Sequence, residues 1–469
     1  MYYQVPQHID KDKIFIINRS EIEDRLEPEF YRPSIATLEK HIRSLATRRL
    51  RDYATYMAGG ATPKKTEADK YYSDSESGIP FLRVQNLQTT GELSLGDCVY
   101  INKDTHNGLL QRSRVAEGDL LVKITGVGRM AIASVAPKGF VGNTNQHMVV
   151  IKTEDAAVSN YLARYLNLDI IERIASRHST GGTRPALDYP SLKNIPVIEG
   201  IDFSIIDEAI SIKKQKEQQS EAVLNSIDDY LLDELGIKSP EIKTDLKSRQ
   251  FFINRSALEG RFDPSVYKDG IKLVSEKYDN VKLSSCAWVN PNTSFRGMDA
   301  DTLISFIPMG VIDECYCEVT SRLKKTIADS TGFTRFQNGD LLWAKITPCM
   351  QNGKSVVVRG LTNGLGCGST EFFVIRPRTN QLSIDYLQAL LHLKAIRKTA
   401  VLYFGGSAGQ QRVSNQFLDN FIVPLPSYVK QQEIVEHISE MRARAKKLQA
   451  EGAEVLQKAK MEVERMILG

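Results

Sequence analysis

The amino-acid sequence repeats one motif at a distance of half its length. Residues 15–33 read FIINRSEIEDRLEPEFYRP, and residues 251–269 read FFINRSALEGRFDPSVYKD. Phe15, Ile17, Asn18, Arg19, Ser20, Arg25, Pro28 and Tyr31 recur, at a constant offset of 236 positions, as Phe251, Ile253, Asn254, Arg255, Ser256, Arg261, Pro264 and Tyr267. Because the chain has 469 residues, this offset predicts two tandem copies of one large unit. Two similar sites at a fixed separation suit a target that has two parts.

The composition is that of a folded globular protein. Hydrophobic residues make up 42% and charged residues 25% of the chain, and no apolar run approaches the roughly 18 residues that span a bilayer. The first residues contain no apolar signal core, so a cytoplasmic chain is expected. The uneven cysteines argue against disulfides, and Cys315-x-Cys317 fits zinc spacing poorly. A net charge of +4 permits nucleic-acid binding without requiring it.

Each half continues with short segments rich in Val, Ile, Phe and Trp between turn residues, which is typical of β-structure. The expected strands lie in 78–87, 118–126, 129–137 and 146–153 of the first half, and in 302–312, 339–348, 354–360 and 370–377 of the second. Both halves share Gly-Asp-Leu-Leu followed by Lys-Ile-Thr, at 118–125 and, with one residue inserted, at 339–347. The shared motif keeps the two β-regions in correspondence.

An amphipathic helix is expected after each β-region. In the first half, apolar residues from Leu162 to Ile174 fall on one face, and Gly181-Gly182 ends the helix. In the second half, Ser383 is the expected N-cap and Gly405-Gly406 the end. A proline-containing strand follows in each half, at 193–198 and 420–426.

Each half is expected to end in a long helix with a coiled-coil seam. Between Tyr428 and Leu468 the seam is Ile434, Ile438, Met441, Ala445, Leu448, Gly452, Val455 and Ala459. Between Phe203 and Leu235 it is weaker: Ile205, Ala209, Ile212, Lys216, Gln219 and Val223. The polar run 213–219 fits either an exposed face or polar residues that fix register. Two such seams in one chain can pack antiparallel, with a globular unit at each end.

The expected fold class is therefore α+β, with two tandem α/β domains separated and joined by long antiparallel coiled-coil helices in a pseudo-two-fold arrangement. The expected boundaries are 1–202 for the first domain, 203–238 for the first helix, 239–427 for the second domain and 428–469 for the second helix.

Several short motifs appear in a particular order. They are Gly59-Gly60-Ala61-Thr62-Pro63, Tyr71-Tyr72, Gly78-Ile79-Pro80, Pro424-Leu425-Pro426 and Gln432 to Val435. In this layout they resemble the specificity subunits of type I restriction–modification systems, in which two target-recognition domains alternate with two helical spacers. The second half departs from that family, because Asn290-Pro291-Asn292-Thr293 replaces the Gly-Gly-x-Thr-Pro turn. The first long helix also lacks a clear Gln-Glu-Ile entry.

The resemblance implies sequence-specific binding of double-stranded DNA with a bipartite target, for an adenine methyltransferase and, in a complete complex, an endonuclease. The implied partners are DNA, two modification subunits and restriction subunits. These subunits would supply S-adenosylmethionine, ATP and Mg²⁺ chemistry, and this chain would bind none of those cofactors.

The catalytic motifs of a methyltransferase or a nucleotide-binding enzyme are absent from the sequence. Asp263-Pro264-Ser265-Val266 and Asn290-Pro291-Asn292-Thr293 lack the second proline and the aromatic residue of an adenine-methyltransferase motif. Gly126-Val127-Gly128 lacks a third glycine, and Gly353-Lys354-Ser355 lacks the upstream glycine of a phosphate-binding loop. The chain is therefore interpreted as a non-catalytic binding subunit.

Duplex DNA is read by cations on phosphates and by Arg, Lys, Asn or Gln on base edges. The candidate DNA-contacting residues are Lys64, Lys65, Arg83, Gln85, Asn86, Lys123, Arg129 and Arg184 in the first half, and Arg296, Lys345, Gln351, Asn352, Lys354, Gln410, Gln411 and Arg412 in the second. Arg83 and Gln85 are expected on one face of a strand, pointing into a groove. Residues 405–409 give the last loop room to follow a DNA backbone.

Three alternatives remain at this point. The chain could serve another methyl-marking phage-defence complex with different effectors, or it could be a free-standing coiled-coil DNA-binding or scaffold protein. The missing motifs disfavour a nuclease or methylase in its own right.

Overall fold

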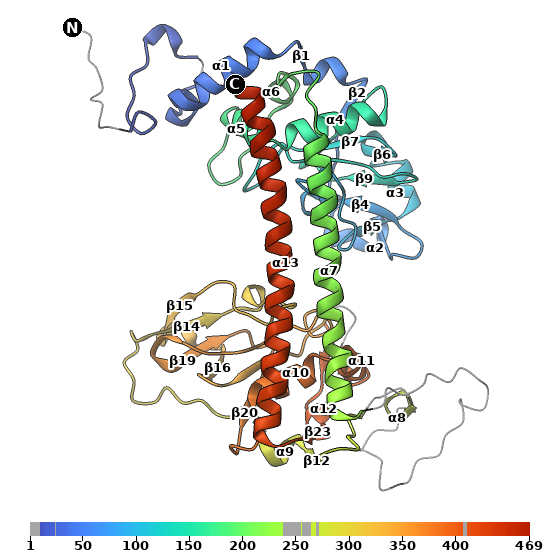
Figure 1. Ribbon diagram of the computed structural model, residues 1–469, viewed down its shortest axis with the longest axis vertical. Coiled ribbons are helices and arrows are strands. Elements are labelled where there is room, and N and C mark those ends of the chain that lie inside the picture. The colour runs from blue at the N-terminus through green and yellow to red at the C-terminus, as the bar shows by residue number, and fades with distance from the viewer. Residues whose placement is uncertain (1–9, 24, 238–254, 256–263, 269–271, 407–409) are drawn as a thin grey trace. The chain divides into compact units, whose positions relative to one another are not determined.

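The computed structural model describes residues 10–23, 25–237, 255, 264–268, 272–406 and 410–469. The chain divides into two compact units (Figure 1): unit 1 comprises residues 1–215 and 451–469, and unit 2 comprises residues 216–450. Most of the second copy of the opening motif lies outside the described residues. In the described part of the chain, we find no helix with the length and apolar character of a membrane span.

Unit 1 contains two sheets that share a hydrophobic cluster. The first is antiparallel, in the order β2 (Tyr56–Gly59), β10 (Met148–Lys152), β7 (Leu120–Lys123) and β8 (Ala133–Val135). The second has the order β3 (Tyr72–Ser73), β5 (Val99–Ile101), β4 (Ile79–Leu82), β9 (Val141–Thr144) and β6 (Arg114–Ala116). Only its β4–β9 pair is parallel.

Unit 2 contains two sheets of the same design. The first has the order β13 (Ala287–Val289), β20 (Phe372–Pro377), β17 (Leu341–Ala344) and β18 (Ser355–Val357). The second has the order β15 (Leu323–Thr326), β14 (Leu303–Ile307), β19 (Leu365–Gly368) and β16 (Thr334–Gln337), with β14–β19 parallel. The β-regions of the two halves therefore have one architecture, and the α+β class expected from the sequence is confirmed.

Short helices and two-stranded ribbons complete the units. In unit 1 they are α1 (Pro33–Leu45), α2 (Ala68–Tyr71), α3 (Lys103–Asn107), α4 (Ala156–Leu166), α5 (Asp169–Arg177), α6 (Tyr189–Lys193) and the ribbon of β1 (Arg48–Arg49) with β11 (Pro196–Val197). In unit 2 they are α8 (Pro264–Lys268), α9 (Leu283–Cys286), α10 (Ile384–His392), α11 (Lys394–Val401), α12 (Asn415–Asp419), the ribbon of β12 (Asp279–Lys282) with β23 (Ile422–Leu425), and the ribbon of β21 (Phe404–Gly405) with β22 (Arg412–Val413).

Each amphipathic helix expected after a β-region is broken into two helices. In unit 1 the break falls at Asn167, whose buried amide group accepts from Ala133 N and donates to Ala133 O, at the edge strand β8. In unit 2 it falls at Leu393, and the N–H of Lys394 donates to the carboxylate of Asp228 at 2.9 Å. The apolar periodicity continues through both breaks, which is why the sequence pattern does not reveal them.

The long helices are confirmed almost to the residue, as α7 (Ser204–Leu235) and α13 (Tyr428–Leu468). In unit 2, Ser220 Oγ donates to Ala445 O at 2.9 Å, and Lys430 lies 2.8 Å from Glu234. The helices are therefore antiparallel there, as the paired segments of Figure 1 show. In unit 1, the start of α7 and the end of α13 join one core through Ile206, Ala209, Ile210, Leu456, Ala459 and Val463.

The seam expected for α7 is confirmed at four of its six positions, since Ala209 is buried and Ile212, Lys216 and Val223 are half-buried, and it is wrong at the other two. Ile205 and Gln219 are exposed, whereas their neighbours Ile206 and Ser220 are buried. The seam expected for α13 is buried or half-buried at all eight positions. Residues 213–219 of α7 are all polar, so they contain no apolar repeat that would show which face of the helix points inward.

The Gly-Asp-Leu-Leu motif has the same role in both units. Its glycines have φ of +81° and +86°, a conformation that favours glycine. The aspartates that follow are buried and form ion pairs, Asp119 with Lys152 of β10 at 2.8 Å and Asp340 with Arg376 of β20 at 2.6 Å. Each motif therefore starts a central strand and ties it to its neighbour.

Candidate nucleic-acid interface

In unit 1, four loops meet beside the first sheet, and we call them loop cluster 1. They are residues 60–65, 124–129, 145–147 and 179–186. Ile124 N donates to His147 O at 2.9 Å, and Gly126 N donates to Pro185 O at 3.0 Å. The hydroxyl of Thr62 donates to the side chain of Gln146. Segments far apart in the sequence are therefore held together on one rigid sheet.

In unit 2, the corresponding loop cluster 2 comprises residues 290–296, 345–353, 369–371 and 405–412, of which 407–409 lie outside the described residues. Lys345 N donates to Glu371 O at 2.9 Å, and Thr347 N donates to Gln411 O at 3.0 Å. The turn at Asn290 follows β13, just as the Gly-Gly-x-Thr-Pro turn follows β2. The two turns thus occupy the same place in the fold.

The Lys-Ile-Thr segments of the two units do not occupy corresponding positions in their sheets. Lys123 lies opposite Met148 in unit 1, and the residue in the same place in unit 2 is Ala344, opposite Phe372. Lys345 lies one position further along. Because successive side chains of a strand alternate in direction, Lys123 is buried and Lys345 is half-buried at the sheet edge.

The sequence-predicted residues of unit 1 separate into two groups. Lys64, Lys65, Gln85 and Arg184 are exposed, and Lys64 makes only a weak surface ion pair with Glu67 at 3.8 Å. The other four, Arg83, Asn86, Lys123 and Arg129, bond to the chain itself.

Two of these inward residues are held firmly. The ammonium group of Lys123 donates to Val127 O at 2.8 Å, and burial lowers its pKa. The guanidinium of Arg129 donates to Asn167 O at 2.6 Å and pairs with Asp169. Both side chains hold loop cluster 1 in place.

The expectation that Arg83 and Gln85 share a strand face is wrong. Strand β4 ends at Leu82, and Val84–Asn86 form a 3-10 helix. The buried side chain of Asn86 accepts from Arg83 N at 2.8 Å and donates to Ser94 O at 2.9 Å. This local bonding competes with strand continuation and turns Gln85 alone toward solvent.

In unit 2, Arg296, Asn352 and Gln410 are exposed, and Gln411 is half-buried. Gln351 is exposed but accepts from the Thr347 hydroxyl. Lys354 donates to Ile312 O at 3.0 Å, and Arg412 makes two bonds of 2.8 Å to the carboxylate of Glu371.

Electrostatics differ between corresponding positions of the two clusters. Burial lowers the pKa of His147, and the nearby Arg184 lowers it further, so the neutral imidazole is favoured. The hydrogen bond from Arg412 lowers the pKa of Glu371 against the opposing effect of burial, and Lys345 adds to the lowering. Arg412 therefore ties its loop to residues 369–371. The other two cations of cluster 2 are Arg296, which is exposed, and Lys345, which is half-buried.

A cationic sheet face in unit 2 was missed from the sequence. Lys325 Nζ lies 4.7 Å from the ring centroid of Phe306 and 5.0 Å from that of Phe333. Arg335 Cζ lies 4.6 Å from the centroid of Phe295. The sequence holds no regular signal for them, because β15 reads Leu-Lys-Lys-Thr and β16 reads Thr-Arg-Phe-Gln, without an alternation of cationic and apolar residues.

A shallow hollow of about 460 Å³ adjoins this face. It is lined by the turn Asn290–Thr293, by Phe333 to Arg335, and by Lys345 and Phe372. Amide groups, cations and aromatic rings meet there, which is the set of side chains that binds phosphates and base edges.

Residues 288–456 match the family described as Type I restriction modification DNA specificity domain. The type I restriction enzyme EcoEI specificity subunit of Escherichia coli is 35% identical over 169 residues, which cover 35% of this chain and 28% of that protein. The EcoAI specificity subunit of the same organism is 33% identical over 188 residues, which cover 39% of this chain and 31% of that protein. The chain thus spans about 30% of the length of the curated relatives that it matches.

Solved structures give weaker likenesses over longer stretches. A chain from a type I R-M system is 13% identical with a TM-score of 0.44, covering 89% of this chain and 95% of that chain. The HsdS subunit from Thermoanaerobacter tengcongensis is 14% identical with a TM-score of 0.34, covering 89% and 94%. The resemblance to type I specificity subunits indicated by the motifs is confirmed by the family match and by both curated relatives.

Proposed function

We propose that the whole chain is a specificity subunit of a type I restriction–modification system, because residues 288–456 match the type I restriction–modification DNA specificity domain. It would recognise a bipartite sequence in double-stranded DNA, with unit 1 reading one half and unit 2 the other. The observation that carries the proposal is the repeated design. Each unit presents a cluster of loops with cations and amides beside its own first sheet, and the two first sheets have corresponding strand orders. The family match, residues 288–456, contains loop cluster 2.

The chemistry would come from partners. The chain would direct two modification subunits, with S-adenosylmethionine as methyl donor, to adenines in the target, and restriction subunits using ATP and Mg²⁺ would join in a complete complex. The missing catalytic motifs and the specificity-subunit relatives support a non-catalytic role. A complex with these partners would act on cellular DNA in the cytoplasm.

The domain boundaries 1–202, 203–238, 239–427 and 428–469 remain part of this proposal. The two helical segments would set the unread gap between the half-targets, because a continuous helix fixes a length that a flexible linker does not.

Exposure and hydrogen bonding divide the candidate DNA-contacting residues into two groups. Those whose polar groups already bond within the chain, such as Asn86, Lys123 and Arg129, are proposed to support the loops. Those proposed to reach DNA are Lys64, Lys65, Gln85 and Arg184 in unit 1, and Arg296, Lys345, Asn352, Gln410, Gln411, Lys325 and Arg335 in unit 2.

The test compares matched variants in each unit, reconstituted with the modification subunit. Arg184→Ala changes loop cluster 1, and Lys345→Ala changes loop cluster 2. Lys138→Ala and Lys398→Ala, exposed lysines outside both clusters, are the controls. The measurement is the methylated motif recovered by sequencing of modified DNA, together with affinity at several salt concentrations.

A base contact should cost about 1–3 kcal/mol of discrimination at one half-target, and a phosphate contact should weaken all sequences and reduce the salt slope by about 1. The controls should leave the motif and the affinity unchanged. If the two cluster variants altered the same half-target, or if the chain methylated DNA without a partner, the proposal would be rejected.

A further inference from the structure

A cavity of about 290 Å³ in unit 1 lies outside the loops proposed to read DNA. Its polar wall consists of Arg43 of α1, Arg49 of β1, His178, and Ser191 and Asn194 at α6. The apolar side chains of Ile174 and Leu187 form part of the remaining wall. Among the described residues that line it, none is acidic.

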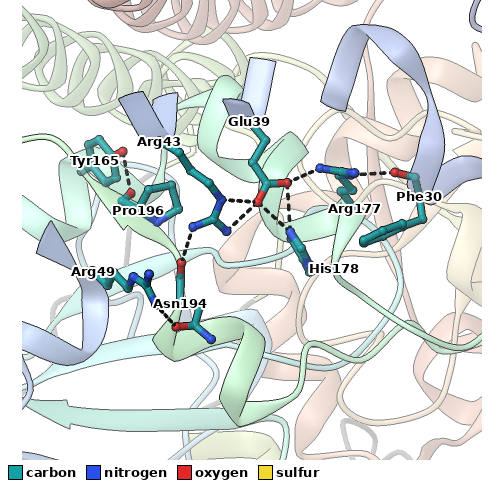
Figure 2. Close-up of polar contacts among 9 residues, drawn as sticks. All are labelled: Phe30, Glu39, Arg43, Arg49, Tyr165, Arg177, His178, Asn194 and Pro196. Atoms are coloured by element: carbon teal, nitrogen blue, oxygen red, sulfur yellow. Dashed lines mark hydrogen bonds and ion pairs between the residues drawn. The ribbon is translucent and has the colours of Figure 1, made fainter. Parts of the chain in front are cut away.

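The charge around the cavity is positive. Behind its wall, the buried carboxylate of Glu39 accepts from Arg43 at 2.6 Å, from Arg177 at 2.6 Å and from His178 at 2.9 Å, as Figure 2 shows. The guanidinium groups of Arg43, Arg177 and Arg49 outnumber this carboxylate. The carboxylate of Asp52 accepts from Arg49 N at 2.7 Å, and its charge is paired with that of Arg51.

Several donors remain for a ligand. Arg49 uses one nitrogen on the side chain of Asn194, at 3.0 Å (Figure 2). Arg43 is more fully engaged, because two of its nitrogens donate to Glu39, at 2.8 and 2.6 Å, and the third makes a long contact of 3.4 Å to Asn194 O. Within the described part of the chain, the other nitrogens of Arg49 and the hydroxyl of Ser191 make no hydrogen bond. The carboxylate of Asp188 accepts from Ser191 N and is not part of the cavity wall.

We propose that this cavity binds a phosphate oxyanion. A guanidinium group presents a planar fork of donors that matches two phosphate oxygens, and a hydroxyl can serve a third. The wall also contains Ile174, Ala175, Leu187 and Ile195, whereas Arg43 and Arg49 are themselves exposed, so salt in the solvent screens the bonds that they make to phosphate. The phosphate can be free in solution or part of a DNA backbone, because the wall residues His178 and Leu187 flank residues 179–186 of loop cluster 1.

The first experiment titrates inorganic phosphate into the full chain by calorimetry, with chloride at matched ionic strength as the blank. Arg49→Ala should weaken phosphate binding at least tenfold, and Ser191→Ala should weaken it severalfold. Arg51→Ala is the matched control, since Arg51 is an exposed arginine that pairs with Asp52 outside the cavity. Arg43 is left intact because its loss would free Glu39.

Absence of saturable phosphate binding would overturn the proposal, and so would an equal loss in Arg49→Ala and Arg51→Ala. This arm contains no DNA, so its result is independent of the DNA-recognition proposal.

The second arm identifies the source of the phosphate and rests on the proposed function. If the cavity takes a backbone phosphate, random-sequence duplex should displace inorganic phosphate, and Arg49→Ala should lower the salt slope of DNA binding by about 1. If it takes free phosphate, duplex should not compete, and the slope should be unchanged. Both outcomes keep the oxyanion site and differ only in what delivers the anion.

Discussion

Replacement of Glu39 by glutamine should destabilise unit 1 more than any surface change of equal size. The Glu39 side chain is 4% exposed and bonds to Arg43, Arg177 and His178 (Figure 2). Burial alone would raise its pKa, but hydrogen bonds and charge from His178 and Arg43 lower it from 4.5 to about 2. That difference corresponds to about 3 kcal/mol, and loss of one member of a buried ion pair costs a similar amount, about 3–5 kcal/mol.

The pH dependence follows from the same values. A carboxyl group with a lowered pKa in the folded state stabilises fully above its unfolded value, here 4.5, and its contribution is lost as the pH falls through about 2. The wild-type chain should therefore lose stability in unit 1 between pH 4.5 and pH 2. Glu39→Gln should lack that part of the loss, because it has no carboxyl group to protonate.

Hydrogen exchange measured on peptides is a suitable assay, because a single unfolding midpoint is poorly defined in a chain with two units. At pH 7, amides of α1 and α5 should exchange faster by a factor corresponding to about 3 kcal/mol. Peptides around Trp343 in unit 2 provide an internal reference. Glu29→Gln is the matched control, since Glu29 is 80% exposed and pairs only with Arg32, and it should change stability by less than about 0.5 kcal/mol. A loss below about 1 kcal/mol in Glu39→Gln would refute the reasoning.

Three further outcomes are expected. Gly60→Ala would place a Cβ 1.8 Å from the Thr144 carbonyl oxygen, so thermal unfolding should show a loss of stability of at least about 2 kcal/mol. Gly182→Ala is the control, because the space around Gly182 is open, and it should be nearly neutral. Similar melting temperatures of the two variants would contradict this prediction. Asp340→Asn breaks a buried pair and should cost about 3–5 kcal/mol in denaturant unfolding. Arg376→Lys puts a lysine opposite Asp340, as in the Asp119–Lys152 pair of unit 1, and should cost less stability than Asp340→Asn. Equal losses in the two variants would show that a lysine cannot replace Arg376 in this pair. Burial lowers the pKa of Lys460 from 10.5 to about 8, so the unfolded chain alone holds the proton between these values and stability of unit 1 should rise with pH across that window. Hydrogen exchange at pH 8, 9 and 10 measures this stability, and in Lys460→Met the stability of unit 1 should no longer rise with pH. If the variant kept the same rise in stability, Lys460 would be excluded as its source.

The sequence by itself determined the plan of the molecule. The offset of 236, the turn residues between β-rich segments and the proline-free stretch 428–468 predicted two similar units and two long helices, and the structure has them. These features depend on local preferences and on periodicity, which are written in the order of the residues. The order of the short motifs likewise indicated the specificity-subunit family, because such motifs are contiguous in the chain.

Tertiary structure decided which side chains face outward. The sequence matched Lys123 with Lys345, but strand pairing puts the two lysines one position apart, so the first is buried and the second reaches the sheet edge. It also decided that Asn86 ends a strand, and that Lys325 and Arg335 lie over aromatic rings. Side chains alternate along a strand, so a shift of one residue reverses their direction. That register is fixed by hydrogen bonds to strands far away in the sequence, which composition and spacing do not encode.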